Sequence, residues 1–136
     1  MIKAATLLRE KGVKFILDVV GDAVNPEDYE YLRNLLEKSK NLIESGLVNF
    51  IPGVPQNGAA LMFKSHKIYV NLSPSGSLDK TILEAAASGS IPIVINQSFK
   101  GVFADDMIVS KDPYDIVAKL EFWLTAPQGE VEKQSL

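Results

Sequence analysis

Apolar positions along the chain follow two spacings, one typical of strands and one typical of helices. Short apolar runs predict strands at residues 13–20, 47–51, 68–72 and 91–95, with a shorter apolar piece at 107–109. Apolar residues three or four positions apart predict helices at residues 2–11, 26–45, 56–65, 79–88 and 113–125. This alternation suits right-handed β-α-β crossovers. The sequence therefore predicts an α/β fold, a three-layer sandwich on a Rossmann-like, mostly parallel sheet of about five strands.

Local signals mark several helix ends. Asn25-Pro26 and Asp112-Pro113 each place a capping side chain before a proline at the first helical position. Gly12 and Gly46 stand where the C-terminal glycine of a helix belongs. The polar tail at residues 126–136 is expected to fray, which leaves a domain over residues 1–125.

Length and composition narrow the class of protein. At 136 residues, the chain is expected to form one domain with its own core. It has no cysteine and one histidine, which excludes a disulfide framework and a thiolate or multi-histidine metal site. The formal charge of -3 offers no basic field for nucleic acid. No apolar run approaches the ~20 residues of a transmembrane segment, and the charged N-terminus lacks a signal-peptide core, so a cytoplasmic location is expected.

The stretch from Leu72 to Asn96 carries the candidate chemistry. A Ser/Pro/Gly turn at residues 73–77 follows one strand and leads into a helix whose first turn contains Asp79, Lys80 and Thr81. In a parallel sheet such a turn lies at the carboxyl end of a strand, where backbone N–H groups and the positive end of a helix dipole receive anions. The sequence therefore predicts a ligand phosphate at this turn.

Several blocks in a fixed order then point to a family. They are Gly21-Asp22, Ile51-Pro52-Gly53, the strand and turn Tyr69-Val70-Asn71-Leu72-Ser73-Pro74-Ser75, and the block LEAAASGSIPIV at residues 83–94. Together they resemble the C-terminal domain of group 1 retaining glycosyltransferases, half of the two-Rossmann-domain (GT-B) architecture, over roughly Ile2 to Leu124. The resemblance implies that this domain holds a nucleotide diphosphate sugar without a metal, while a separate N-terminal domain brings the acceptor. It assigns no catalytic residue to this chain.

The resemblance also implies a donor site. Glu84 would accept hydrogen bonds from the two ribose hydroxyls, which suits a carboxylate because it has two acceptor oxygens. The other implied contacts are the backbone at Lys80 and Thr81 for the diphosphate, Ser75, Gly76 and Ser77 for the sugar, and Gly53 and Val54 for the base.

Two departures from the family pattern modify this expectation. Gly76 stands where the family commonly has a sugar-facing glutamate, and Asp79, a candidate substitute, stands where a small residue normally lets phosphate approach. The chain also begins inside the helix that follows the family's first strand, so it is expected to be a fragment relative to the family. The gap would separate the strands at 13–20 and 68–72. Either these strands pair directly, or another segment or chain fills the gap, which would allow a homodimer.

Structural roles compete with these functional ones. Glu84 could complete a capping box with Thr81, although Ser77 or Asp79 could cap the helix earlier. Lys80 could be a solvated helix residue. The turn at residues 73–77 could be a plain connection. His66 is expected at the surface and Trp123 in the core or at an interface.

Three functions stay open. The first is the donor-binding half of a metal-independent glycosyltransferase, with little activity on its own. The second is a non-catalytic nucleotide-binding module. The third is an interaction domain without a ligand, oligomerising through the unfilled sheet position.

Overall fold

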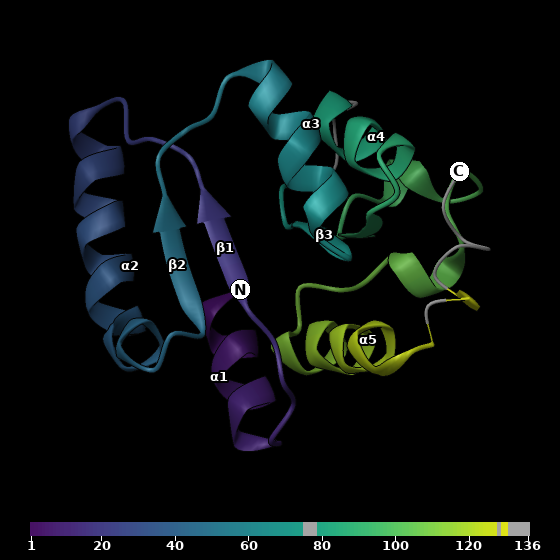
Figure 1. The fold of residues 1–136 in the computed structure, drawn as a ribbon, viewed down its shortest axis with the longest axis horizontal. Coiled ribbons are helices and arrows are strands. Elements are labelled where there is room, and N and C mark those ends of the chain that lie inside the picture. Colours follow the sequence, from purple (N-terminus) through teal and green to yellow (C-terminus); the bar gives the residue numbers. More distant parts are fainter. Residues whose placement is uncertain (75–78, 128, 131–136) are drawn as a thin grey trace. The chain divides into compact units, whose positions relative to one another are not determined.

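A computed structural model describes residues 1–74, 79–127 and 129–130, and the chain divides into two compact units (Figure 1). One unit spans Ile2–Pro55, and the other spans Gln56–Leu136 together with Met1. In both units helices alternate with parallel strands, so the predicted α/β class is confirmed. The four named strands form two two-stranded sheets.

The first unit contains two helices and two strands. They are α1 (Ile2–Glu10), β1 (Leu17–Val20), α2 (Pro26–Glu44) and β2 (Val48–Ile51). β1 and β2 pair in parallel, with Leu17 opposite Val48 and Val19 opposite Phe50. Because side chains alternate along a strand, these four residues share one face. That face packs in a cluster whose buried members are Ala5 of α1, Leu42 of α2 and Val48.

The opposite face of the β1-β2 pair carries a polar contact. Asn49 Nδ2 donates to Asp18 Oδ1 at 2.8 Å across the two strands. The apolar face is therefore the one that α1 and α2 cover, and Asp18 is a cross-strand partner in this unit.

The ends of α2 confirm both local signals. Asn25 Oδ1 accepts from Asp28 N at 2.8 Å while Asn25 N donates to Asp28 Oδ2 at 3.3 Å, which is a reciprocal capping box. At the other end Gly46 has a φ of 74°, a conformation that glycine adopts without steric cost. Backbone bonds from Gly46 to Ile43 and from Leu47 to Leu42 close the last turn, and β2 starts one residue later.

The second unit contains the remaining elements. They are α3 (Gln56–Ser65), β3 (Ile68–Asn71), α4 (Lys80–Ala87), β4 (Ile91–Val94), the short 3-10 helices η1 (Gln97–Phe99) and η2 (Asp105–Met107), and α5 (Pro113–Thr125). β3 and β4 pair in parallel, and every residue of β4 is buried, as expected of a central parallel strand. In the apolar piece at 107–109, Met107 ends η2 and Ile108 forms an isolated parallel bridge with Val94, where Val109 N donates to Val94 O at 2.9 Å.

Helix α5 supplies much of the core of the second unit. Its apolar stripe is buried as predicted, through Ile116, Val117, Leu120 and Trp123. Lys67, which immediately precedes β3, donates from Nζ to Ala126 O at 2.9 Å and to Leu124 O at 3.3 Å. An ammonium group at this end of a helix satisfies terminal carbonyls and favours the helix dipole. In the described part of the chain, no helix has the length and apolar character of a membrane span.

The Lys67 contact gives a first test. Lys67→Met keeps the aliphatic stem but removes the donor, so we expect the free energy of unfolding to fall by about 1 kcal/mol. Chemical denaturation followed by circular dichroism would measure the loss. Lys64→Met, at an exposed position of α3, is the matched control. Equal stability of the two variants would contradict a capping role for Lys67.

Candidate functional site

The carboxyl end of β3 is held by a hydrogen-bonded asparagine. The Asn71 side chain is 8% exposed; its Oδ1 accepts from Ser73 N at 3.0 Å, and its Nδ2 donates to Asp79 Oδ2 at 2.7 Å. Asn71 therefore fixes the first residues after β3 and, eight positions later, the residue that precedes α4.

Asp79 is the N-cap of α4. Its Oδ1 accepts from Thr81 N at 3.0 Å and from Thr81 Oγ1 at 2.6 Å. Tyr69 Oη lies 2.9 Å from Thr81 Oγ1 and accepts from Asn71 Nδ2 at 3.3 Å, so the four side chains form one network. We call Tyr69, Asn71, Asp79 and Thr81 the cap network.

The cap network favours the ionised form of Asp79. The hydrogen bond from the Thr81 hydroxyl lowers the pKa of Asp79 below its ordinary value; partial burial opposes this shift, while the bonds from Asn71 and the Thr81 backbone add to it. The carboxylate is therefore charged at neutral pH and lies at the positive end of the α4 dipole.

The Thr81 N–H, which the family resemblance implies for a diphosphate, donates to the carboxylate of Asp79 in this structure. Asp79 is likewise a helix cap in this structure, with both of its oxygens accepting hydrogen bonds. A ligand at this end of α4 would meet the Lys80 side chain and the remaining N–H groups, beside a negative charge.

Glu84 lies on the exposed side of α4. Lys80, Thr81 and Glu84 are solvent-exposed, while Ile82, Ala85 and Ala86 on the other side are buried. The alternative that Glu84 completes a capping box is wrong, because the cap is Asp79 and Glu84 lies beyond the first turn. Within the described residues, the Glu84 carboxylate makes no hydrogen bond or ion pair. It is therefore available to a ligand.

The other residues implied by the family resemblance fall elsewhere. Ser75, Gly76 and Ser77 lie outside the described residues. Gly53 and Val54 follow β2 and belong to the Ile2–Pro55 unit. Gly53 N donates to Asp22 Oδ1 at 2.9 Å, and a Cβ at this position would overlap the same carboxylate, so a larger residue here would displace the Asp22 side chain.

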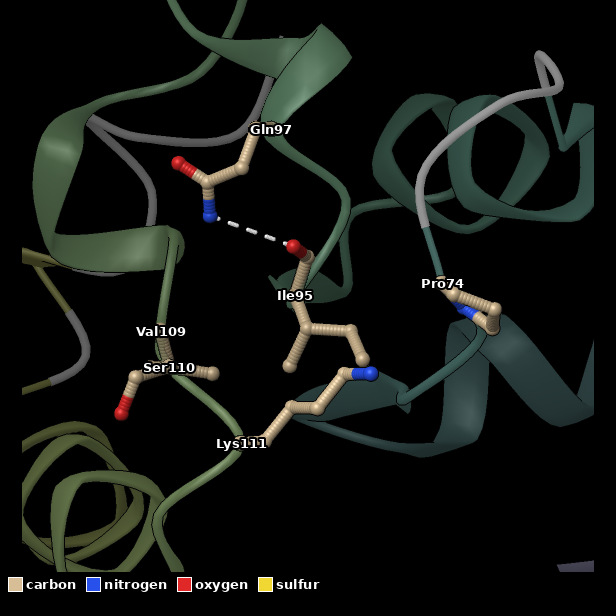
Figure 2. A pocket seen from close by; sticks show the side chains of 6 residues that line it. All are labelled: Pro74, Ile95, Gln97, Val109, Ser110 and Lys111. Atoms are coloured by element: carbon tan, nitrogen blue, oxygen red, sulfur yellow. Dashed lines mark hydrogen bonds between the residues drawn. The ribbon is translucent and has the colours of Figure 1, made fainter.

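A pocket opens beside the cap network, at the carboxyl end of β4 (Figure 2). Its volume is about 280 Å³ and its lining residues are Pro74, Ile95, Gln97, Val109, Ser110 and Lys111. Ile95 N donates to Asn71 O at 3.4 Å, so the pocket continues directly from the end of β3. The pocket therefore lies at the carboxyl edge of the sheet, where ligands bind in parallel α/β folds.

Sequence reasoning identified one residue of this pocket, Pro74, through the turn at residues 73–77, and missed the others. It predicted residues 107–109 only as a short apolar piece. The available signal was the polar sequence Ser110-Lys111 immediately after an apolar run, which is the position that carries ligand contacts in parallel sheets. In the part of the chain that the structure describes, no three His, Cys, Asp or Glu side chains gather as they would around a metal ion.

Comparison with known proteins supports the fold assignment. No protein-family model matches the sequence, and no curated protein matches it. Among solved structures, one with a similar fold is the catalytic domain of cholesterol-alpha-glucosyltransferase from Helicobacter pylori, with a TM-score of 0.73 and 20% sequence identity, over 98% of this chain and 80% of that chain. At this identity the likeness establishes the fold.

The cap network predicts a pH-dependent stability effect. Asp79→Ala removes the cap, so we expect the free energy of unfolding to fall by about 1 kcal/mol at neutral pH. Because the folded pKa of Asp79 lies below its ordinary value, the charged carboxylate stabilises the fold above that ordinary value. The difference between wild type and variant should therefore shrink as the pH falls through the lowered pKa.

Denaturation curves of both proteins at a series of pH values would measure this difference. Asp105→Ala, at an exposed position of η2, serves as the control. A difference that stays constant from neutral to strongly acidic pH would contradict the role given to the Asp79 charge.

Proposed function

We propose that this chain is the donor-binding domain of a glycosyltransferase and holds a nucleotide diphosphate sugar. The observation that carries the proposal is the exposed Glu84 carboxylate, which no structural role occupies within the described residues, on a helix that follows the carboxyl end of a parallel strand. The likeness to a glycosyltransferase catalytic domain supports it at the level of the fold.

In this proposal Glu84 binds the ribose of the donor. Its two oxygens accept one hydrogen bond from each of two vicinal hydroxyls, which is a charge-assisted arrangement. Lys80 lies one helical turn earlier on the same exposed side, where its ammonium group would offset part of the diphosphate charge. The negative side chain would thus accept hydrogen bonds from the ribose, and the positive side chain would face the diphosphate.

In this proposal the donor-binding chain and a separate acceptor-binding domain each contribute to sugar transfer. The bond between the anomeric carbon of the sugar and the diphosphate oxygen breaks, a bond to an acceptor oxygen forms, and the acceptor hydroxyl loses its proton. We assign to this chain the binding and orientation of the donor, without a metal. The residues that bind the acceptor and take up its proton are assigned to a separate domain, in line with the family resemblance.

One observation favours a second candidate. The Asp79 carboxylate occupies the Thr81 N–H and places a negative charge at the N-terminus of α4, which disfavours a diphosphate there. A non-catalytic module that binds a nucleoside, or a nucleotide through Glu84 alone, would tolerate this charge. The two candidates differ in whether the sugar and diphosphate add to the affinity.

Binding through Glu84 can be tested by titration. In NMR titrations with UDP, GDP, ADP and their sugar derivatives, we expect one nucleotide series to shift the amide signals of residues 80–84. Glu84→Gln should weaken that binding by about 1.5 to 3 kcal/mol, or roughly 10- to 100-fold, because a charge-assisted pair is lost. Glu37→Gln, at an exposed position of α2, is the control.

The outcomes separate the candidates. Tighter binding of a nucleotide sugar than of the bare nucleotide supports the donor-binding proposal, whereas equal affinities favour the second candidate. No change in the amide signals with any nucleotide, or unchanged affinity in Glu84→Gln, would contradict both candidate functions.

If a separate domain binds the acceptor, this chain should have little transferase activity on its own. With the nucleotide sugar that binds, the 136-residue chain should transfer sugar to water or to added acceptors at a small fraction of the rate of a complete two-domain glycosyltransferase. Release of the nucleoside diphosphate, coupled to an enzymatic assay, would measure it. A rate within tenfold of such an enzyme, abolished in Glu84→Gln, would overturn the assignment of the acceptor chemistry to a separate domain.

A further inference from the structure

We propose that the pocket at the carboxyl end of β4 binds a single sugar-sized ring that carries a carboxylate, with Lys111 as the counter-charge. The chemical class of the ligand is thus a hexuronic acid. The lining residues of the pocket all belong to the Gln56–Leu136 unit. The identification of this ring with the sugar of a nucleotide-sugar donor rests on the proposed function.

The size of the pocket limits what it can hold. At about 280 Å³ it lies just below the range of roughly 300 to 1,000 Å³ that is usual for sites of drug-sized ligands. A single ring with one substituent is compatible with this volume, whereas a complete nucleotide sugar is too large for it.

The walls of the pocket are largely apolar. Ile95 is 8% exposed and Val109 is 2% exposed, and Pro74 forms the wall on the side of β3. Such surfaces pack against the C–H groups of a ring, while a small number of polar groups fixes its orientation. Gln97 supplies one of those groups, and its amide nitrogen is held by a 3.2 Å bond to Ile95 O (Figure 2).

The charge of the pocket comes from one residue. Among the described residues that line it, only Lys111 is charged. Its side chain extends past Ile95 toward the side on which Pro74 lies (Figure 2). Within the described residues Lys111 makes no ion pair, so an anion in the pocket would be its counter-charge. Lys111 itself is exposed to solvent, so the strength of such a pair depends on how far the ligand and the apolar walls exclude water from it.

The acidic residues next to Lys111 in the sequence have other roles. Asp112 Oδ1 accepts from Tyr114 N at 3.0 Å as the cap of α5, and Asp115 Oδ2 accepts from Ser110 N at 2.7 Å. The Ser110 hydroxyl accepts from Asp112 N at 3.2 Å and points away from Ile95 (Figure 2). The start of α5 thus uses its own carboxylates to satisfy backbone donors, which leaves the ammonium group of Lys111 to a ligand.

The pocket and the Glu84 side of α4 are joined by the connection after β3. Pro74 belongs both to the pocket wall and to the connection between β3 and α4, whose two ends Asn71 and Asp79 are bonded together. On the proposed function, the sugar of a donor bound at Glu84 would occupy this pocket. An acidic sugar would bring a counter-charge to Lys111 and a neutral sugar would not, and this difference favours an acidic one.

The test uses the complete 136-residue chain and small probes. Backbone amide spectra would be recorded with free glucuronate, glucose and inorganic phosphate in parallel. Glucuronate should shift the signals of Ile95, Val109 and Lys111, and glucose should not. Lys111→Met should weaken glucuronate binding by about tenfold, the loss of one charge-assisted contact, whereas Lys111→Arg should retain it.

Lys64→Met is the matched control for removal of an exposed lysine, and the dispersion of each variant's spectrum shows that it is folded. Three results would each overturn the proposal. They are equal binding of glucose and glucuronate, phosphate binding as tightly as glucuronate, and unchanged glucuronate affinity in Lys111→Met.

The same titration separates this proposal from the donor-binding function. Nucleotides that shift residues 80–84, with no response of the pocket to glucuronate, would overturn the pocket proposal alone. If the pocket binds glucuronate and the chain binds no nucleotide, the pocket proposal is supported and the donor-binding function is overturned. Tighter binding of a nucleotide glucuronate than of the corresponding glucose derivative, lost in Lys111→Met, would support both.

Discussion

The hydrogen bond between Asn71 and Asp79 is the interaction on which the candidate site depends. It joins the last residue of β3 to the cap of α4 across a connection of seven residues, and Asn71 is nearly buried where it does so. A buried amide that loses its partner costs the full desolvation of the group, so this contact strongly restrains the helix start. The directions of Lys80 and Glu84 follow from where α4 begins, and the wall at Pro74 is part of the same connection.

The cap network also decides how anions can bind. Many α/β proteins leave the first N–H groups of a helix open for a phosphate. Here the helix start is occupied by its own carboxylate, and its dipole is partly compensated from within the chain. Positive charge for a ligand therefore comes from side chains, Lys80 on α4 and Lys111 beside β4. Each ammonium group attracts a negative charge only where its own side chain can reach. The affinity of such a site therefore depends on where the ligand carries its negative substituents as well as on its phosphates.

The sequence predicted the elements well where their signals are local. Asn25-Pro26 and Asp112-Pro113 start helices because the cap and the proline act within one turn, and both starts are present. It left open whether Ser77 or Asp79 caps α4, because the bond that holds Asp79 in this role comes from Asn71, eight residues away. It did not predict the pocket, since Ile95 and Lys111 come together only through the bridge between Val94 and Ile108. The division into two strand pairs has the same cause, because periodicity identifies strands but not their neighbours.

The position of Trp123 has a practical consequence. It is the only tryptophan in the chain, it is 3% exposed, and its indole ring packs edge-on against Phe122 in the second unit. The Ile2–Pro55 unit contains no tryptophan. Intrinsic fluorescence excited at the red edge of tryptophan absorption therefore reports on the unit that contains β3, β4 and the pocket, whereas circular dichroism averages over both. Comparing the two signals would show whether the units lose their structure together or one at a time, without any label.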